Sequence, residues 1–280
     1  MKIRILISSI LLISFFSMKA QEQIEINLSL KTEPTNKIDF TQSSIDIFYS
    51  NKLDGKTKIT NTLEYSNLSA NYELESYKTR EDEEQFNQIQ NKFEISHDLS
   101  NTMNLNFLII PTLNFQSNAN LSDLSLLGSL EMSQQFNSRA SLKIGIARST
   151  ALGNAKFLPI VSFLYTFNNE NSLQIGFPDS KITYSNTVRN KFRLTNSFNG
   201  SFYHLNATNQ SINNAVKTTL SQMTTAFEYE RNVDKNWFLN FKAGYDFNKK
   251  YNLIDRDNHK VYDFNPGNGY VLGIGIKYKH

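Results

Sequence analysis

Residues 269–280 read GYVLGIGIKYKH and alternate between two kinds of side chain. In an extended strand, successive side chains point to opposite faces. One face of this stretch is mostly small or cationic, and the other is apolar and aromatic, formed by Tyr270, Leu272, Ile274, Ile276 and Tyr278. We expect this stretch to be the closing strand of a barrel, which pairs back to the first strand.

The same alternation returns along the chain, for example in MNLNFLIIPTLNFQ at residues 103–116 and in WFLNFKAGYDFN at residues 237–248. Helices repeat their apolar positions every three or four residues, whereas strands repeat them every second residue. The sequence therefore predicts an all-β protein, a transmembrane up-and-down antiparallel β-barrel. We expect fourteen strands, at about residues 23–31, 41–50, 56–76, 86–98, 103–116, 123–136, 141–149, 156–168, 172–177, 181–187, 191–205, 216–231, 237–248 and 269–280.

The connections between these strands are alternately short and long along most of the chain, as in bacterial outer-membrane barrels. With the short connections in the periplasm, as in those barrels, both termini lie on the periplasmic side. The weakest assignments are the pair of strands around GFPDSKITYS, residues 176–185, and the first strand. If the short pair is not in the wall, or if the first strand and its partner are not, twelve strands remain, which is also an even number.

A soluble β-sandwich is the main alternative, because its strands alternate too and the mean hydropathy of −0.43 is that of a soluble protein. Several expected strands reach about 12 residues, whereas strands of globular proteins average about 5 or 6 and a membrane-spanning strand needs about 9 to 11. Aromatic residues also lie near strand ends on the apolar face, where barrels carry their interfacial girdles. These features favour the membrane barrel.

The first twenty residues, MKIRILISSILLISFFSMKA, have the charged, apolar and polar parts of an export signal. We expect cleavage after Ala20 and a mature barrel of residues 21–280. The signal holds Lys2, Arg4 and Lys19 and no acidic residue, so the formal charge of +3 disappears on maturation. A mature chain with equal numbers of basic and acidic residues gives no reason to expect nucleic acid as a partner. The absence of cysteine excludes disulfides and thiolate chemistry.

Three segments resemble a known family: GFPDSKITYS, AFEYERNVDKNWFLNFKAGYDF at residues 226–247, and GYVLGIGIKYKH. They look like an uncharacterised family of bacterial outer-membrane β-barrels, the domain-of-unknown-function family numbered 6268. The resemblance implies a β-barrel in the outer membrane of a Gram-negative bacterium, and it brings no catalytic residue. The last strand also resembles the signal read by the barrel-insertion machinery, although it ends in His280 rather than in the usual Phe.

No pattern in the sequence predicts catalysis, and we expect no enzyme, no cofactor and no metal. The chain has four histidines and neither a Gly-x-Ser-x-Gly nor a His-Glu-x-x-His motif. His97 and His204 fall near strand ends on the apolar face, where an interfacial role is expected. Asp255, Arg256, Asp257 and Asn258 could offer oxygen ligands to calcium, but the spacing of an EF-hand loop is missing, which favours a solvated turn.

Charged residues on the polar face are the candidate functional residues, because a charge inside a barrel needs water or a partner. We expect ten to face the lumen: Glu64, Lys92, Glu94, Glu131, Lys143, Glu228, Glu230, Lys242, Asp246 and Lys277. Their mixed signs suit a narrow channel or transporter for small solutes, and they also suit a closed lumen with salt bridges.

Two functions therefore stay open. In the first, the barrel provides a path for small solutes through the outer-membrane lipid. In the second, it conducts nothing and serves as a structural or assembly partner in a cell-envelope complex, with residues 80–85 and 206–215 as binding surfaces.

Overall fold

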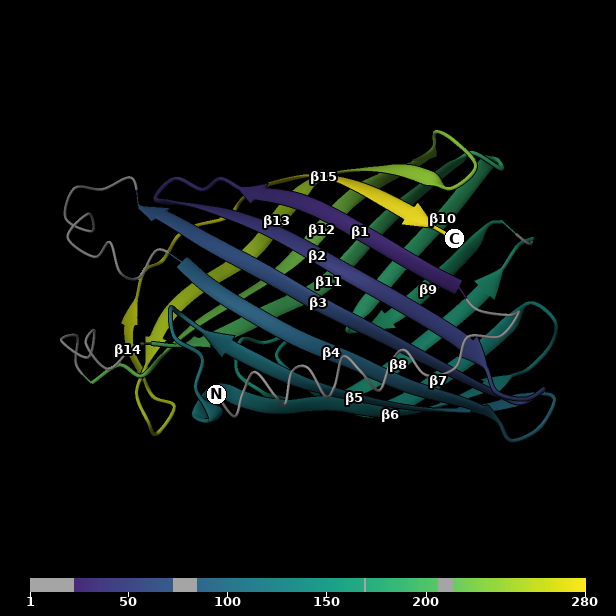
Figure 1. Ribbon diagram of the computed structural model, residues 1–280, viewed down its shortest axis with the longest axis horizontal. Helices are drawn as coiled ribbons and strands as arrows, with labels where there is room; N and C mark the ends of the chain where they lie inside the picture. Colours follow the sequence, from purple (N-terminus) through teal and green to yellow (C-terminus); the bar gives the residue numbers. More distant parts are fainter. Residues whose placement is uncertain (1–22, 73–84, 169, 206–213) are drawn as a thin grey trace.

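The computed structural model describes residues 23–72, 85–168, 170–205 and 214–280 (Figure 1). Within these ranges almost every residue outside the turns is in a strand, and one short 3₁₀ helix, η3, spans Leu121–Asp123. The expected signal, residues 1–20, lies outside the described residues. The strands are β1 (Gln23–Glu33), β2 (Ile38–Lys52), β3 (Thr57–Tyr72), β4 (Gln85–Asp98), β5 (Met103–Phe115), β6 (Leu124–Gln135), β7 (Ala140–Ser149), β8 (Lys156–Thr166), β9 (Ser172–Phe177), β10 (Asp179–Thr187), β11 (Asn190–His204), β12 (Lys217–Asn232), β13 (Trp237–Ile254), β14 (Lys260–Asp263) and β15 (Gly269–Lys279).

The sheet closes on itself. Each strand from β1 to β13 pairs antiparallel with the next, β13 pairs with β15, and β15 pairs with β1 from Glu25↔Lys279 to Thr32↔Leu272. The short strand β14 pairs with β13 alone, so fourteen strands form the wall. The predicted all-β antiparallel barrel and its count of fourteen are confirmed, and GYVLGIGIKYKH is the strand that closes it. Figure 1 shows β15 lying beside β1.

The outer face is apolar. The last strand exposes Tyr270, Leu272, Ile274 and Ile276 by 67%, 51%, 53% and 39%, and β1, β6, β7 and β8 expose comparable residues. A belt of this size would be unfavourable in water, whereas hydrocarbon accommodates it. A spanning sheet must also close, because lipid offers its edges no hydrogen-bond partner.

One end of the barrel, the turn end, carries the short connections. Its turns are held by side chains that accept backbone hydrogens: Asn137 Oδ1 accepts from the amides of Arg139 and Ala140 at 2.8 and 2.9 Å. Asp54 accepts from the amides of Lys56 and Thr57, and these bonds hold the pKa of its carboxyl below the usual range. The ring pairs Trp237–Tyr278 and Tyr165–Phe167 lie near this end with centroids 5.1 Å apart, where an interfacial girdle is expected.

The opposite end, the loop end, differs from the prediction. Residues 248–268 were expected to be a loop, but β13 continues to Ile254 and turns into a hairpin with β14. The register of β12 and β13 shifts at this point, where Asn248 has a φ of 51°. Such a bulge adds one residue and reverses which side chains face inward. Phe247 is therefore exposed, while Tyr251 is buried inside the barrel.

Candidate functional site

The interior near the turn end is lined by paired charges. Eight of the ten expected lumen residues form four ion pairs: Glu64–Lys92 at 2.9 Å, Glu131–Lys143 at 2.8 Å, Glu228–Lys242 at 3.3 Å and Glu230–Lys277 at 2.7 Å. Partners in each pair come from neighbouring strands, or from strands one place further apart. Glu94 has no ion pair within the described ranges.

A fifth basic residue, which is not among the ten expected, links two of these pairs. The guanidinium of Arg193 on β11 lies 3.8 Å from Glu228 and 3.5 Å from Glu230. Arg193 follows Phe192 in a strand with the same alternation, so its parity could have identified it. It lines a vestibule of about 540 Å³, together with Glu25, Asp46, Glu228, Lys242 and Lys277.

The tenth expected residue, Asp246, belongs to a deeper ion cluster. The Lys249 ammonium is fully buried, 2.5 Å from Glu33 Oε2 and 3.0 Å from Asp246 Oδ2. Glu33 also pairs with Lys31 at 2.7 Å, and Asp246 accepts a hydrogen bond from Thr224 at 2.6 Å. Two cations and two carboxylates thus balance each other, and of the four only Lys31 is partly exposed. Strict alternation from Phe247 would place Lys249 on the outer face, and the bulge at Asn248 brings it inside instead.

Above the ion cluster, an apolar core fills the lumen. Its rings come from opposite walls: Phe86 on β4 stacks on Tyr203 on β11 at 5.0 Å, and Phe40 on β2 meets Tyr251 on β13 at 5.3 Å. The Tyr72 and Tyr251 hydroxyls are 3.3 Å apart. The core is completed by Ile38, Leu68, Ala70, Ala215, Leu220, Leu253 and Phe264. We call this set the apolar plug.

The loop end of β11 leaves the wall and reaches across the barrel. His204 pairs in parallel with Phe115 at the end of β5, although five strands separate β5 from β11 along the sheet. This contact divides the loop end into two compartments. One lies between β1–β5 and β11–β15 and holds the apolar plug, and the other is bounded by β6–β10.

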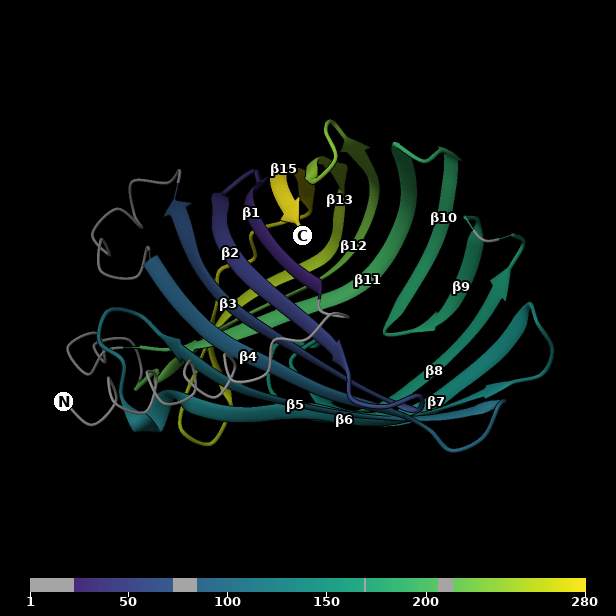
Figure 2. The same ribbon diagram turned by 45° about the vertical axis from the view of Figure 1, so that its right-hand side comes forward.

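The second compartment is closed by the turn between β7 and β8, residues 150–155. Thr150 Oγ1 donates to the carbonyl of Gly200 on β11 at 2.8 Å. The fit is close, because a Cβ on Gly200 would lie 2.2 Å from the Thr150 carbonyl oxygen. Gly153, at a φ of 93°, packs on Thr219 and Ser221 of β12. The β9–β10 hairpin is too short to extend the wall here: β10 pairs with β11 only up to Ser197 (Figure 2).

An inner cavity of about 270 Å³ lies below both closures. Its lining includes Thr150 and Gly200 of the turn contact, and it shares Lys31 and Lys242 with the vestibule. Side-chain amides are frequent in the lining: Gln42, Gln88, Gln90, Asn199 and Gln222. Polar side chains thus line the interior from the vestibule to the inner cavity, and within the described residues the apolar plug and the turn at residues 150–155 lie at its loop end.

Residues 17–279 match the family described as Domain of unknown function (DUF6268). The chain belongs to this family. No curated protein matches the sequence at a significant level.

Several solved barrels are similar to the DUF6268 chain in fold. A mutant of the TodX monoaromatic hydrocarbon channel has a TM-score of 0.49 at 9% identity, covering 94% of this chain and 90% of that one. A Pseudomonas aeruginosa FadL homologue has a TM-score of 0.46 at 9% identity, covering 92% and 89%. The KdgM porin has a TM-score of 0.37 at 7% identity, covering 90% and 98%. Similarity at this level concerns the barrel fold alone.

No helix in the described part of the DUF6268 chain is long and apolar enough to cross a membrane. His204, expected at the interface, lies instead beside η3, with its Nδ1 3.8 Å from Asp123 Oδ1. The hydroxyl of Ser122 donates to the same carboxylate at 3.4 Å rather than to the imidazole. This order of contacts does not match that of a Ser-His-acid triad, in which the hydroxyl bonds to the imidazole.

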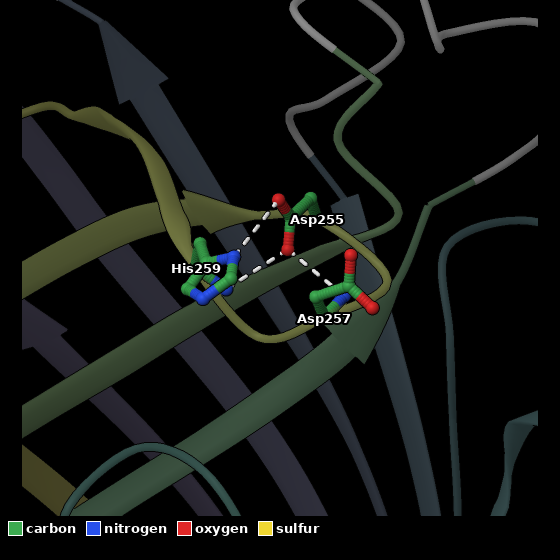
Figure 3. A group of neighbouring side chains, drawn as sticks. All are labelled: Asp255, Asp257 and His259. Atoms are coloured by element: carbon green, nitrogen blue, oxygen red, sulfur yellow. Dashed lines mark hydrogen bonds and ion pairs between the residues drawn. The ribbon is translucent and has the colours of Figure 1, made fainter.

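The acidic turn at residues 255–259 caps its own backbone. Asp255, Asp257 and His259 lie together (Figure 3), but Asp255 Oδ1 already accepts the amides of Asp257 and His259 at 2.9 and 2.8 Å. In the same hairpin, the hydrogen bond from Lys260 lowers the pKa of Asp263. These contacts account for the cluster as a structural turn, as the sequence analysis favoured.

Proposed function

We propose that this DUF6268 barrel is a gated path for small solutes through the outer membrane of a Gram-negative bacterium, with the turn end in the periplasm. One observation carries the proposal: a polar vestibule leads to an inner cavity that ends at the turn of residues 150–155. A lumen that only stabilised the wall would not need a continuous polar cavity leading to that point.

The two closures at the loop end differ in how easily they could open. The apolar plug buries several aromatic rings from opposite walls, so separating them would expose a large apolar surface to water. The turn rests on Gly200 through one hydrogen bond from Thr150 and through glycine contacts. A net hydrogen bond contributes about 0.5–1.5 kcal/mol, which thermal motion overcomes readily. The turn is therefore the proposed gate.

Substituting Gly200→Ala tests this. The added methyl would meet the Thr150 carbonyl oxygen and displace the turn. We expect the variant to show a severalfold higher mean conductance than the wild type in planar bilayers. The matched control is Gly145→Ala in β7, where a Cβ would also meet a backbone oxygen, that of Leu130 at 2.4 Å, far from the turn. If the wild type and both variants fold but none of them conducts current, the proposal is contradicted.

A non-conducting barrel in a cell-envelope complex is the second candidate, and the apolar plug favours it because a packed lumen needs no gate. The two surfaces expected to bind partners are residues 80–85 and 206–215, and most of each, residues 80–84 and 206–213, lies outside the described residues. Lipid surrounds the barrel in either case, and the alternating last strand would be recognised by the insertion machinery. Conductance of Gly200→Ala separates the two candidates.

A further inference from the structure

The inner cavity offers hydrogen-bond acceptors and no spare charge. It is lined by β1–β4 on one side and by β11 and β12 on the other, and it joins the vestibule at Lys31 and Lys242. Its chemistry therefore indicates what kind of solute the proposed path would hold, and this inference rests on the proposed function.

The charged groups of the lining are already neutralised by other protein groups. Glu33 binds Lys31 and Lys249 at 2.7 and 2.5 Å, and Lys242 lies 3.3 Å from Glu228. A charged ligand would have to break one of these pairs or remain unpaired in a largely buried site, and both are costly. The lining thus disfavours ionic solutes.

The orientation of three amides follows from the carboxylates around them. A carboxylate accepts hydrogen bonds and donates none, so the group facing it must be a donor. Gln222 turns its Nε2 to Glu33 at 3.3 Å, and Gln90 turns its Nε2 to Glu64 at 2.8 Å. Thr224 gives its hydroxyl hydrogen to Asp246, so it accepts from Asn199 Nδ2 at 3.1 Å.

These bonds use the amide N–H groups and leave the carbonyl oxygens of the three amides as acceptors for a ligand, and that of Gln222 is the buried one. Gln222 is 6% exposed, and its buried Oε1 has no partner among the described residues. A buried acceptor of this kind is costly unless something donates to it. The missing group is therefore a hydrogen-bond donor, and the balanced charge indicates a neutral one.

We propose that the inner cavity binds a small neutral polyhydroxylated solute, one monosaccharide in size. Sugar hydroxyls would donate to the carbonyl oxygens of Gln90, Asn199 and Gln222. Leu68, Leu220 and Val271, which also line the cavity, would contact the C–H face of the ring. A volume of about 270 Å³ suits one ring rather than a longer chain.

Calorimetry on the detergent-solubilised full chain tests this without requiring conductance. The probes are D-glucose and D-galactose as neutral solutes, D-glucuronate as an anion and D-glucosamine as a cation. We expect a neutral sugar to bind with the highest affinity. Gln222→Met and Gln90→Met keep the side-chain length and remove the acceptor, so each should weaken binding roughly tenfold.

Gln174→Met in β9, outside the cavity, is the matched control and should leave binding unchanged. Heat-dependent gel migration shows that each variant is folded. The inference is overturned if the folded wild type binds no neutral sugar, if a charged sugar binds more tightly, or if Gln174→Met weakens binding as much as the cavity variants do. A barrel that binds sugar but never conducts contradicts only the proposed function, and one that conducts without binding contradicts only this inference.

Discussion

The ring of Phe86 on β4 stacks on the ring of Tyr203 on β11, with centroids 5.0 Å apart and planes inclined by 30°. These strands stand on opposite walls of the barrel, so the contact spans the lumen. It also anchors the end of β11 that pairs with β5. The apolar plug is therefore a tertiary core inside a membrane barrel, and it should behave as such a core does.

Truncating the plug should lower stability. Phe86→Ala removes a fully buried ring, and buried Phe→Ala changes cost about 3–5 kcal/mol in protein cores. Urea unfolding of the barrel in lipid vesicles measures the loss. Phe107→Ala on β5 is the control, because Phe107 is on the outer face and 46% exposed. An equal loss in both variants would mean that the plug contributes no more than lipid contact.

Locking the turn should stop conduction reversibly. A Cβ on Gly153 would lie 3.7 Å from that of Ser221, within the 3.5–4.5 Å that a disulfide needs. The chain has no cysteine of its own, so Gly153→Cys with Ser221→Cys forms a defined pair. We expect conductance only after reduction. Each single cysteine variant should be insensitive to the reductant. Conductance that persists while the disulfide is formed would exclude the turn as the gate.

Removing Lys249 should destabilise the barrel strongly. Lys249→Met leaves the buried Asp246 without its ion pair and Glu33 with Lys31 alone, and breaking a buried pair costs about 3–5 kcal/mol. Lys260→Met in the hairpin is the comparison. Its pair with Asp263 is largely exposed, and exposed pairs contribute about 0–1 kcal/mol. Equal midpoints of denaturation in the two variants would argue against a buried cluster.

Arg193 should set ion selectivity once the gate is open. In the Gly200→Ala background, Arg193→Gln removes the positive charge shared by Glu228 and Glu230. The vestibule then becomes more negative and should favour cations. The reversal potential in a salt gradient should move toward the cation limit. An unchanged potential would place the ion path away from the vestibule.

The wall of the barrel could be predicted from sequence because lipid imposes one rule on every strand. Outer residues are apolar, so alternation locates Leu272 and Ile274 directly, and the same parity locates Glu228 and Lys242 on the other face. That parity predicts which charged residues face the lumen, although it does not identify which of them pair with each other. The parity rule fails wherever a strand changes face.

The loop end could not be predicted for this reason. At Asn248 a bulge brings Lys249, Tyr251 and Leu253 inside, so an apolar face that had pointed to lipid becomes core. The contact of His204 with Phe115 joins residues far apart in sequence and gives no local signal. Neither the apolar plug nor the two compartments could be derived from periodicity alone.

The bulge at Asn248 also makes the interior sensitive to chain length. Deleting one residue just beyond it, Lys250, with the pairing of β12 and β13 kept continuous, would leave Lys249 inside but turn Tyr251 and Leu253 toward lipid. The apolar plug would then lose two of its side chains. A hollow and a filled barrel are thus separated, in sequence space, by one codon, and length variation at this position would be a short route by which relatives gain or lose a packed lumen.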